Sequence, residues 1–188
     1  MSKTTQMLKN YKTNLEQEQN DINIIIKAEE IFGDIFTREN EFCHLTASSF
    51  VINKEHTKVL CIYHNIYKSW GWIGGHADGS DDMLFTARKE TEEETSLKNF
   101  KELLPHPISV EILPVNGHIK RNKYVSSHTH LNITYLFEAD ENEQIKILES
   151  ENSNVGWLYF DELIEKCEEP HMIAIYKKII NKIKELKL

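Results

Sequence analysis

The segment Gly74–Leu97, GGHADGSDDMLFTARKETEEETSL, begins with two glycines and continues into a stretch rich in glutamate. If this stretch is helical, a turn of about 100° per residue places Glu90, Glu93 and Glu94 within roughly a third of the circumference. A neighbouring stripe that can face a core consists of Leu84, Ala87 and Thr91. Three like charges side by side repel each other, and a hard divalent cation removes that repulsion. The segment therefore predicts a carboxylate metal site on a partly buried helix.

The spacing within this segment is more specific than a run of glutamates on a solvated helix face. Gly75 is followed after five residues by Asp81, and after seven more by the run KETEEETSL, residues 89–97. This pattern resembles the Nudix box, G-x5-E-x7-R-E-U-x-E-E-x-G-U, in which U is apolar. The matching positions are Gly75, Glu90, Glu93, Glu94 and Leu97.

Four positions depart from that pattern. Asp81 replaces a glutamate and keeps its charge on a shorter stem, and Thr91 stands where an aliphatic residue is usual. Lys89 replaces an arginine, and an ammonium cannot reproduce the bidentate fork of a guanidinium on a carboxylate. Ser96 replaces the glycine that ends the helix. All three glutamates that resemble the family's metal ligands are nevertheless present.

The resemblance implies a Mg²⁺-dependent hydrolase, with Mn²⁺ as a substitute, that cleaves a pyrophosphate linkage in a nucleoside diphosphate joined to another moiety. It implies Glu90, Glu93 and Glu94 as metal ligands, with the carbonyl of Gly75 as a further one. A metal held there would neutralise phosphate charge and lower the pKa of a bound water.

The general base varies within the family. We expect Glu93 to serve, with Glu149 or Glu151 from a distal loop as the alternative, and we expect Lys89 to orient a carboxylate of the box. Two other functions share the fold: a non-catalytic nucleotide-sensing domain, and an enzyme like isopentenyl-diphosphate isomerase. Loss of a metal glutamate would indicate the sensor, and the isomerase commonly needs a pocket cysteine, for which Cys43 and Cys61 lie in no recognisable motif.

Composition describes a soluble globular protein of 188 residues, 40% apolar and 28% charged, with a formal net charge of −8. The acidic balance argues against general binding to nucleic acid or anionic membranes, so an anionic small-molecule substrate must be bound locally. No stretch approaches the roughly 18 apolar residues of a membrane span. The first residues lack the apolar core of a signal peptide, and three scattered cysteines fit reduced thiols, which together predict a cytoplasmic protein.

Alternating and continuous apolar runs predict strands around the central helix. The expected strands are Thr46–Ile52, Lys58–His64, Trp70–Ile73, Ile108–Val115, Leu131–Ala139 and Val155–Phe160. We expect Asp78, Ser80 or Asp81 to cap the box helix, Asp161 to cap a short helix, and Pro170 to precede a C-terminal amphipathic helix. These elements predict an α/β class, with an α/β/α sandwich around a mixed sheet, as the Nudix resemblance implies for about residues 42–165.

Residues 1–40 are predicted to be helical and to form an N-terminal extension to a domain of residues 41–188. Apolar residues recur at four-residue steps at Met7, Tyr11 and Leu15. The resemblance does not cover this segment, which either packs on the domain or covers a second copy in a homodimer.

Substrate contacts are predicted for histidines near the glycines and on a later strand. His76 follows the glycine pair and is placed to reach a phosphate. His128, His130 and Asn132 share one face of their strand at two-residue spacing, and that face meets either water or a cleft. Trp70 or Trp72 is the alternative place for a base to stack.

Overall fold

The computed structural model describes residues 1–120, 122–148 and 152–186. Its centre is a mixed sheet in which, over the described residues, eight strands pair. Strands β10, β2, β1, β9 and β5 form its main path, and β3, β4 and β6 pair with β2, β1 and β9. The long pair β1 and β9 is parallel, whereas the other pairings are antiparallel.

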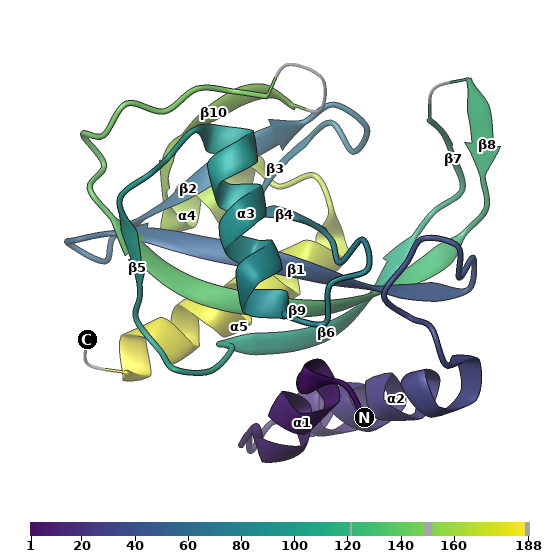
Figure 1. The fold of residues 1–188 in the computed structure, drawn as a ribbon. Helices are drawn as coiled ribbons and strands as arrows, with labels where there is room; N and C mark the ends of the chain where they lie inside the picture. The colour runs from purple at the N-terminus through teal and green to yellow at the C-terminus, as the bar shows by residue number, and fades with distance from the viewer. Residues whose placement is uncertain (121, 149–151, 187–188) are drawn as a thin grey trace.

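The strands are β1 (Cys43–Asn53), β2 (Lys58–His64), β3 (Ser69–Gly71), β4 (Ile73–His76), β5 (Phe100–Glu102), β6 (Ser109–Val115), β7 (His118–Lys120), β8 (Lys123–Val125), β9 (His128–Ala139) and β10 (Asn152–Tyr159). The helices are α1 (Lys3–Asn10), α2 (Glu16–Phe32), α3 (Met83–Thr95), α4 (Phe160–Lys166) and α5 (Pro170–Glu185). Strands β7 and β8 form a separate hairpin that projects from the body of the molecule (Figure 1).

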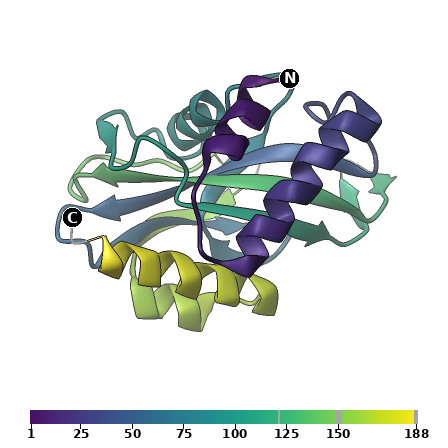
Figure 2. The same cartoon turned by 90° about the horizontal axis from the view of Figure 1, so that it is seen from below.

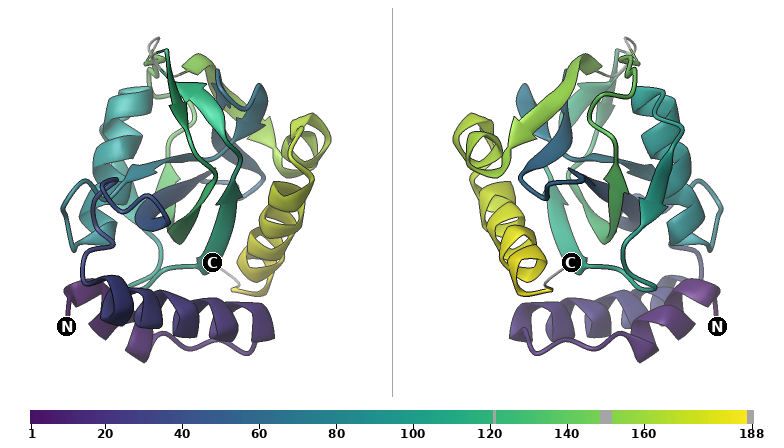
Figure 3. Two further views of the ribbon diagram at one scale, coloured as in Figure 1. Left: turned by 90° about the vertical axis from the view of Figure 1, so that its right-hand side faces the viewer. Right: turned by 90° about the vertical axis from the view of Figure 1, so that its left-hand side faces the viewer.

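Helices cover both faces of the sheet. Helix α3 lies on one face and α4 with α5 on the other, as the two side views in Figure 3 show. Because side chains alternate along a strand, β1 supplies both cores: Val51 packs with the α3 side, whereas Phe50 and Ile52 pack with the α5 side. The predicted α/β/α sandwich around a mixed sheet is therefore confirmed.

The N-terminal helices cross one end of the sandwich, as the view from below shows (Figure 2). Helix α2 packs against β6, and Leu8, Ile22 and Ile25 are buried in the same core as α3. The helical conformation is interrupted between α1 and α2, so the N-terminal segment contains two helices instead of one. Leu15 precedes α2 and is 38% exposed, so the predicted stripe does not continue through it.

A buried ion-pair network joins the N-terminal segment to α5. The carboxylate of Glu18, 0% exposed, lies 2.6 Å from Nζ of Lys182 and 3.4 Å from Nζ of Lys178. Lys178 also lies 2.9 Å from Glu111 on β6. Burial acts to raise the pKa of Glu18, but hydrogen bonds from Lys182 and Thr13 and the nearby ammonium charges outweigh it and lower that pKa. The segment is thus packed on the sheet and not extended into solvent.

Three local predictions were wrong. The expected strand Trp70–Ile73 is divided at Trp72, because β3 pairs with β2 whereas β4 crosses to pair with β1. Helix α3 is capped by Asp82, whose side chain accepts a hydrogen bond from the backbone of Phe85. Helix α4 already begins at Phe160, so Asp161 lies in its first turn and is not its cap.

Candidate active site in the pocket beside the box helix

A pocket of about 650 Å³ opens where β1, β4 and β9 approach α3. That volume is in the range of small-molecule sites. Its wall includes Gly75, Lys89, Glu90 and Glu93 from the predicted box. The hairpin β7–β8 contributes His118, Tyr124 and Val125 to the same wall.

Helix α3 is fixed to the sheet by buried polar bonds as well as apolar contacts. The Thr91 hydroxyl donates to Ser49 at 2.7 Å, and Ser49 donates to the carbonyl of Ala87 at 2.9 Å. All three residues are buried. The threonine that stands in place of an aliphatic residue is therefore satisfied, and its face of the helix is held against β1.

The glycine pair lies directly beside two of the glutamates. A Cβ on Gly75 would stand 2.3 Å from the carboxyl carbon of Glu90, so only glycine fits there without a shift. The backbone N–H of Gly74 donates to Glu94 at 3.4 Å, and the Glu94 residue is only 2% exposed. Strand β4 and the carboxylates on α3 are thus in contact.

Lys89 lies between two carboxylates of the box. Its ammonium is 3.4 Å from Glu90 and 3.2 Å from Glu93. Partial burial acts to lower the pKa of Lys89, but the hydrogen bond to Glu93 and the charges of both glutamates raise it. A lysine held between two carboxylates is arranged as expected for a residue that orients them. Glu92, by contrast, points away and pairs with Lys98 at 3.1 Å.

The donor set on α3 fits a hard divalent cation. Glu90 is largely buried and Glu93 is half exposed, and both line the pocket. Carboxylate oxygens and a backbone carbonyl are the ligands that Mg²⁺ takes, together with waters and substrate phosphates. Glu90, Glu93 and Gly75 line the same pocket, whereas Glu94, the third predicted ligand, is buried and is not part of its lining.

The loop that leads into α3 is held by residues from outside the box. Arg38 makes two hydrogen bonds to the carboxylate of Asp78, at 2.9 and 2.7 Å. The Thr4 hydroxyl donates to the carbonyl of Asp81 at 2.8 Å, and Lys3 lies 3.9 Å from the Asp81 carboxylate. The N-terminal segment therefore positions the loop of the candidate site.

The substrate-binding residues predicted on β9 divide into two groups. His128 and His130 line the pocket, as does His76. Asn132 belongs to the lining too, but it is 1% exposed, and its side-chain oxygen accepts hydrogen bonds from Thr46 and Ser48. A substrate contact by any of these four residues stays a prediction.

The sequence interpretation did not identify His44 and Glu169 as pocket residues. His44 precedes a run of apolar and small residues on β1, and only its pairing opposite His130 brings it to the site. Burial raises the pKa of Glu169, which lines the same pocket. The two glutamates before Pro170 give no sequence signal that one of them lines a pocket or has a raised pKa. Glu149 and Glu151, the alternative general bases, lie outside the described residues.

The cysteines do not supply a pocket nucleophile or acid. Cys43, Cys61 and Cys167 are all free and buried, and none of them lines the pocket. Burial raises the pKa of each thiol. This arrangement argues against the isomerase alternative.

Within the described residues, no helix is both long and apolar enough to cross a membrane.

Comparison with known proteins gives the class to which this fold and site belong. The model of the NUDIX domain matches residues 43–179, and the chain therefore belongs to the Nudix family. The match leaves α1 and α2 outside the family's domain. Comparison with curated proteins gave no match.

Solved structures share the fold at low identity. An Ap4A hydrolase from C. elegans, in a binary complex, is 17% identical over 75% of this chain and 98% of its own, with a TM-score of 0.55. The Nudix hydrolase RenU from M. smegmatis is 13% identical over 77% and 88%, with a TM-score of 0.57. The NUDIX domain of NrtR from Shewanella oneidensis, solved with ADP ribose, is 13% identical over 82% and 97%, with a TM-score of 0.54.

Proposed function

We propose that this protein is a Mg²⁺-dependent pyrophosphohydrolase that cleaves a nucleoside diphosphate linked to another moiety, with Mn²⁺ able to replace Mg²⁺. The observation that carries the proposal is the arrangement of Gly75, Lys89, Glu90 and Glu93 on the wall of one pocket. Family membership and the pocket's nucleotide-compatible volume support it.

The roles of the residues follow from their positions. Glu90, Glu93 and Glu94 would hold the cation, with the carbonyl of Gly75 as a further ligand. The cation, when bound, neutralises phosphate charge and makes a bound water more acidic. Glu93 is the most exposed of these three glutamates, since its side chain is 52% exposed whereas that of Glu90 is 14% exposed and Glu94 is buried. It is our candidate for the base that accepts a proton from that water. Lys89 holds Glu90 and Glu93 in position.

The substrate itself requires a positive anchor in a protein of net charge −8. His76, His128 and His130 border the pocket and offer imidazole N–H groups that can donate to phosphate oxygens. Two of the neighbours have names that specify a nucleotide-type ligand, Ap4A or ADP ribose. These similarities favour a nucleotide-type substrate for this chain. We expect the protein to work in the cytoplasm.

The test is a screen of purified protein against ADP-ribose, nucleotide sugars, dinucleoside polyphosphates, oxidised nucleotides and coenzyme A, each with Mg²⁺ or Mn²⁺. Chromatography of the products identifies the bond that is cleaved. We expect Glu93→Gln to lower turnover by about 100-fold or more, since it replaces a charged ligand by a neutral one of equal size. The matched control is Glu92→Gln, one residue away on the solvated face, which should retain wild-type turnover.

Two outcomes would contradict the proposal. Equal turnover in wild type and Glu93→Gln would exclude the assigned site. Tight nucleotide binding by calorimetry without cleavage of any compound would instead support the nucleotide-sensing alternative.

A further inference from the structure

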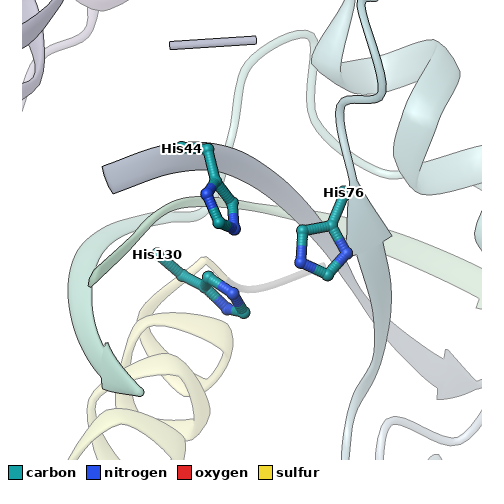
Figure 4. A group of neighbouring side chains, drawn as sticks. All are labelled: His44, His76 and His130. Carbon is teal, nitrogen blue, oxygen red and sulfur yellow. The ribbon is translucent and has the colours of Figure 1, made fainter. Parts of the chain in front are cut away.

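A second group of possible metal ligands lies in the same pocket, built from imidazoles. His44 lies near the start of β1, His76 ends β4 and His130 lies near the start of β9. Strand β1 runs between the other two: His44 is opposite His130, and Thr46 is opposite His76. The three rings therefore project from one face of the sheet toward a common point, as Figure 4 shows.

The spacing of these rings suits a single ion. One ligand nitrogen from each of the three histidines lies within 4.8 Å of the others. Ring centroids are 5.1 Å apart for His44 and His76, 5.1 Å for His44 and His130, and 4.9 Å for His76 and His130. Three nitrogens at about 2.0–2.1 Å from one tetrahedral Zn²⁺ lie about 3.3 Å from one another. Small rotations of the side chains would bring the three nitrogens to that separation.

The hydrogen bonds of the His44 ring give the clearest indication that this group can bind a metal ion. The Nδ1 of His44 lies 3.0 Å from the carbonyl of Asn40, which fixes the proton on that nitrogen. The residue is 4% exposed, and among the described residues its buried Nε2 has no hydrogen-bond partner. A buried nitrogen without a partner is unfavourable, and it is rare in folded proteins. Metal-binding histidines characteristically donate their second N–H to a backbone carbonyl in this way.

A fourth histidine, His128, is in contact with the group formed by His44, His76 and His130. The Nδ1 of His128 lies 2.8 Å from the carbonyl of Ser126, so its Nε2 carries a lone pair. That Nε2 lies 3.3 Å from Nε2 of His130, and the His128 ring is 4.8 Å from His44. Because Nε2 of His128 can only accept in this tautomer, the contact is a hydrogen bond when His130 carries a proton on its Nε2.

We propose that His44, His76 and His130 form a binding site for a divalent transition-metal ion of the zinc type, separate from the carboxylate site on α3. Imidazole nitrogens favour zinc, copper, nickel and iron, whereas carboxylate and carbonyl oxygens favour magnesium and manganese. Three protein ligands leave a tetrahedral ion one position for water or for an anionic oxygen of a bound ligand. The pocket would then hold two metal sites that differ in chemistry.

Binding of the metal alone tests this proposal. Protein freed of metal by chelator dialysis is titrated with Zn²⁺ against a chromophoric zinc indicator, with Mg²⁺ in excess to occupy the carboxylate site. We expect one equivalent of Zn²⁺ per chain, with affinity reduced about 100-fold or more in His44→Ala and in His130→Ala, because even indirect support of a ligand is worth 10–100-fold. Co²⁺ in place of Zn²⁺ should give the visible absorption of a tetrahedral nitrogen-bound ion.

Three variants serve as controls. His106→Ala removes a surface-loop histidine and should bind Zn²⁺ as the wild type does. Glu93→Gln should also keep the site, and this result separates it from the proposed catalytic centre. Since His44 is buried, His76→Gln provides a second ligand variant, and melts without metal verify that each variant is folded.

Several results would overturn the proposal. One is no stoichiometric Zn²⁺ binding by the wild type. Another is unchanged affinity in folded His44→Ala and His130→Ala. Loss of Zn²⁺ binding in Glu93→Gln would assign the ion to the carboxylates. Histidine-dependent binding of inorganic phosphate in the presence of chelator, without Zn²⁺ binding, would make the cluster an anion site.

Discussion

The backbone of Gly75 lies so close to the carboxylate of Glu90 that a Cβ would stand 2.3 Å from its carboxyl carbon. Strand β4 and helix α3 thus meet at a proposed metal-ligand position, and the contact explains physically why glycine begins the box. Gly75→Ala must move Glu90 or bend β4. We expect it to weaken the stabilisation of the fold by Mg²⁺ and to lower turnover by about 10-fold or more, since small misplacements at a site are costly.

The matched control for that substitution is Gly156→Ala. A Cβ at Gly156 would meet no atom within 4 Å, and its φ is not positive. Thermal melts with EDTA and with Mg²⁺ report the stabilisation, because an ion that binds only the native state raises its stability with concentration. An unaltered Mg²⁺ response in Gly75→Ala would remove Glu90 from the metal site.

Ser96 ends α3 in the left-handed conformation, with φ of 58°, at the position where the family pattern has glycine. A residue with a Cβ pays about 1–2 kcal/mol for that conformation. We therefore expect Ser96→Gly to raise the free energy of unfolding by about 1 kcal/mol, as measured by urea denaturation. Ser80→Gly, in the loop before α3, should bring no gain. A destabilised Ser96→Gly would show that the hydroxyl contributes more than the strain costs.

The stability of the folded state should depend on pH through the carboxyl group of Glu18. Its pKa is lowered below the ordinary value of 4.5 by Lys182, Thr13 and Lys178 acting against burial. The folded state therefore binds fewer protons than the unfolded state. The stabilisation is present above the unfolded pKa and is lost as pH falls through the folded pKa.

The measurement is the difference in melting temperature between wild type and Glu18→Gln across the acid range. We expect Glu18→Gln to be strongly destabilised at neutral pH, by about 3–5 kcal/mol, because it leaves the partly buried ammonium of Lys182 without the carboxylate of Glu18. The difference should shrink as pH falls below 4.5. Glu16→Gln, an exposed neighbour on α2, should show neither effect, and a pH-independent gap for Glu18→Gln would refute the linkage.

We propose that residues 1–40 are an extension on which a domain of residues 41–188 depends. Leu8 is 1% exposed in the core beneath α3, so Leu8→Ala should cost about 2–5 kcal/mol by chemical denaturation. Leu15→Ala, at a largely exposed site, should cost little. Deletion of residues 1–38 should cause aggregation or a changed mass by light scattering, without selective loss of metal binding. A truncated protein of unchanged stability and mass would show the segment to be dispensable.

The sequence by itself determined the central helix and its chemistry. Glutamates at 90, 93 and 94 must share a helix face, because helical periodicity is local, and alternation along residues 128–137 likewise separates polar from apolar faces. The sequence also determined the α/β/α sandwich, since strands that precede and follow one amphipathic helix can bury their apolar faces in only a few arrangements. The N-cap of α3 is Asp82, one position after the last of the expected candidates, because several neighbouring aspartates can each cap the helix.

Only the tertiary structure decided which distant residues complete the site. The parallel pairing of β1 with β9 places His44 beside His130, and β4 crosses to bring His76 to both. Thr4 reaches the carbonyl of Asp81 across 77 positions of sequence. Strand register and helix docking are set by burial over the whole core, and no short-range pattern contains them. For that reason a motif was enough to propose the carboxylate site, whereas no motif indicates the histidine cluster.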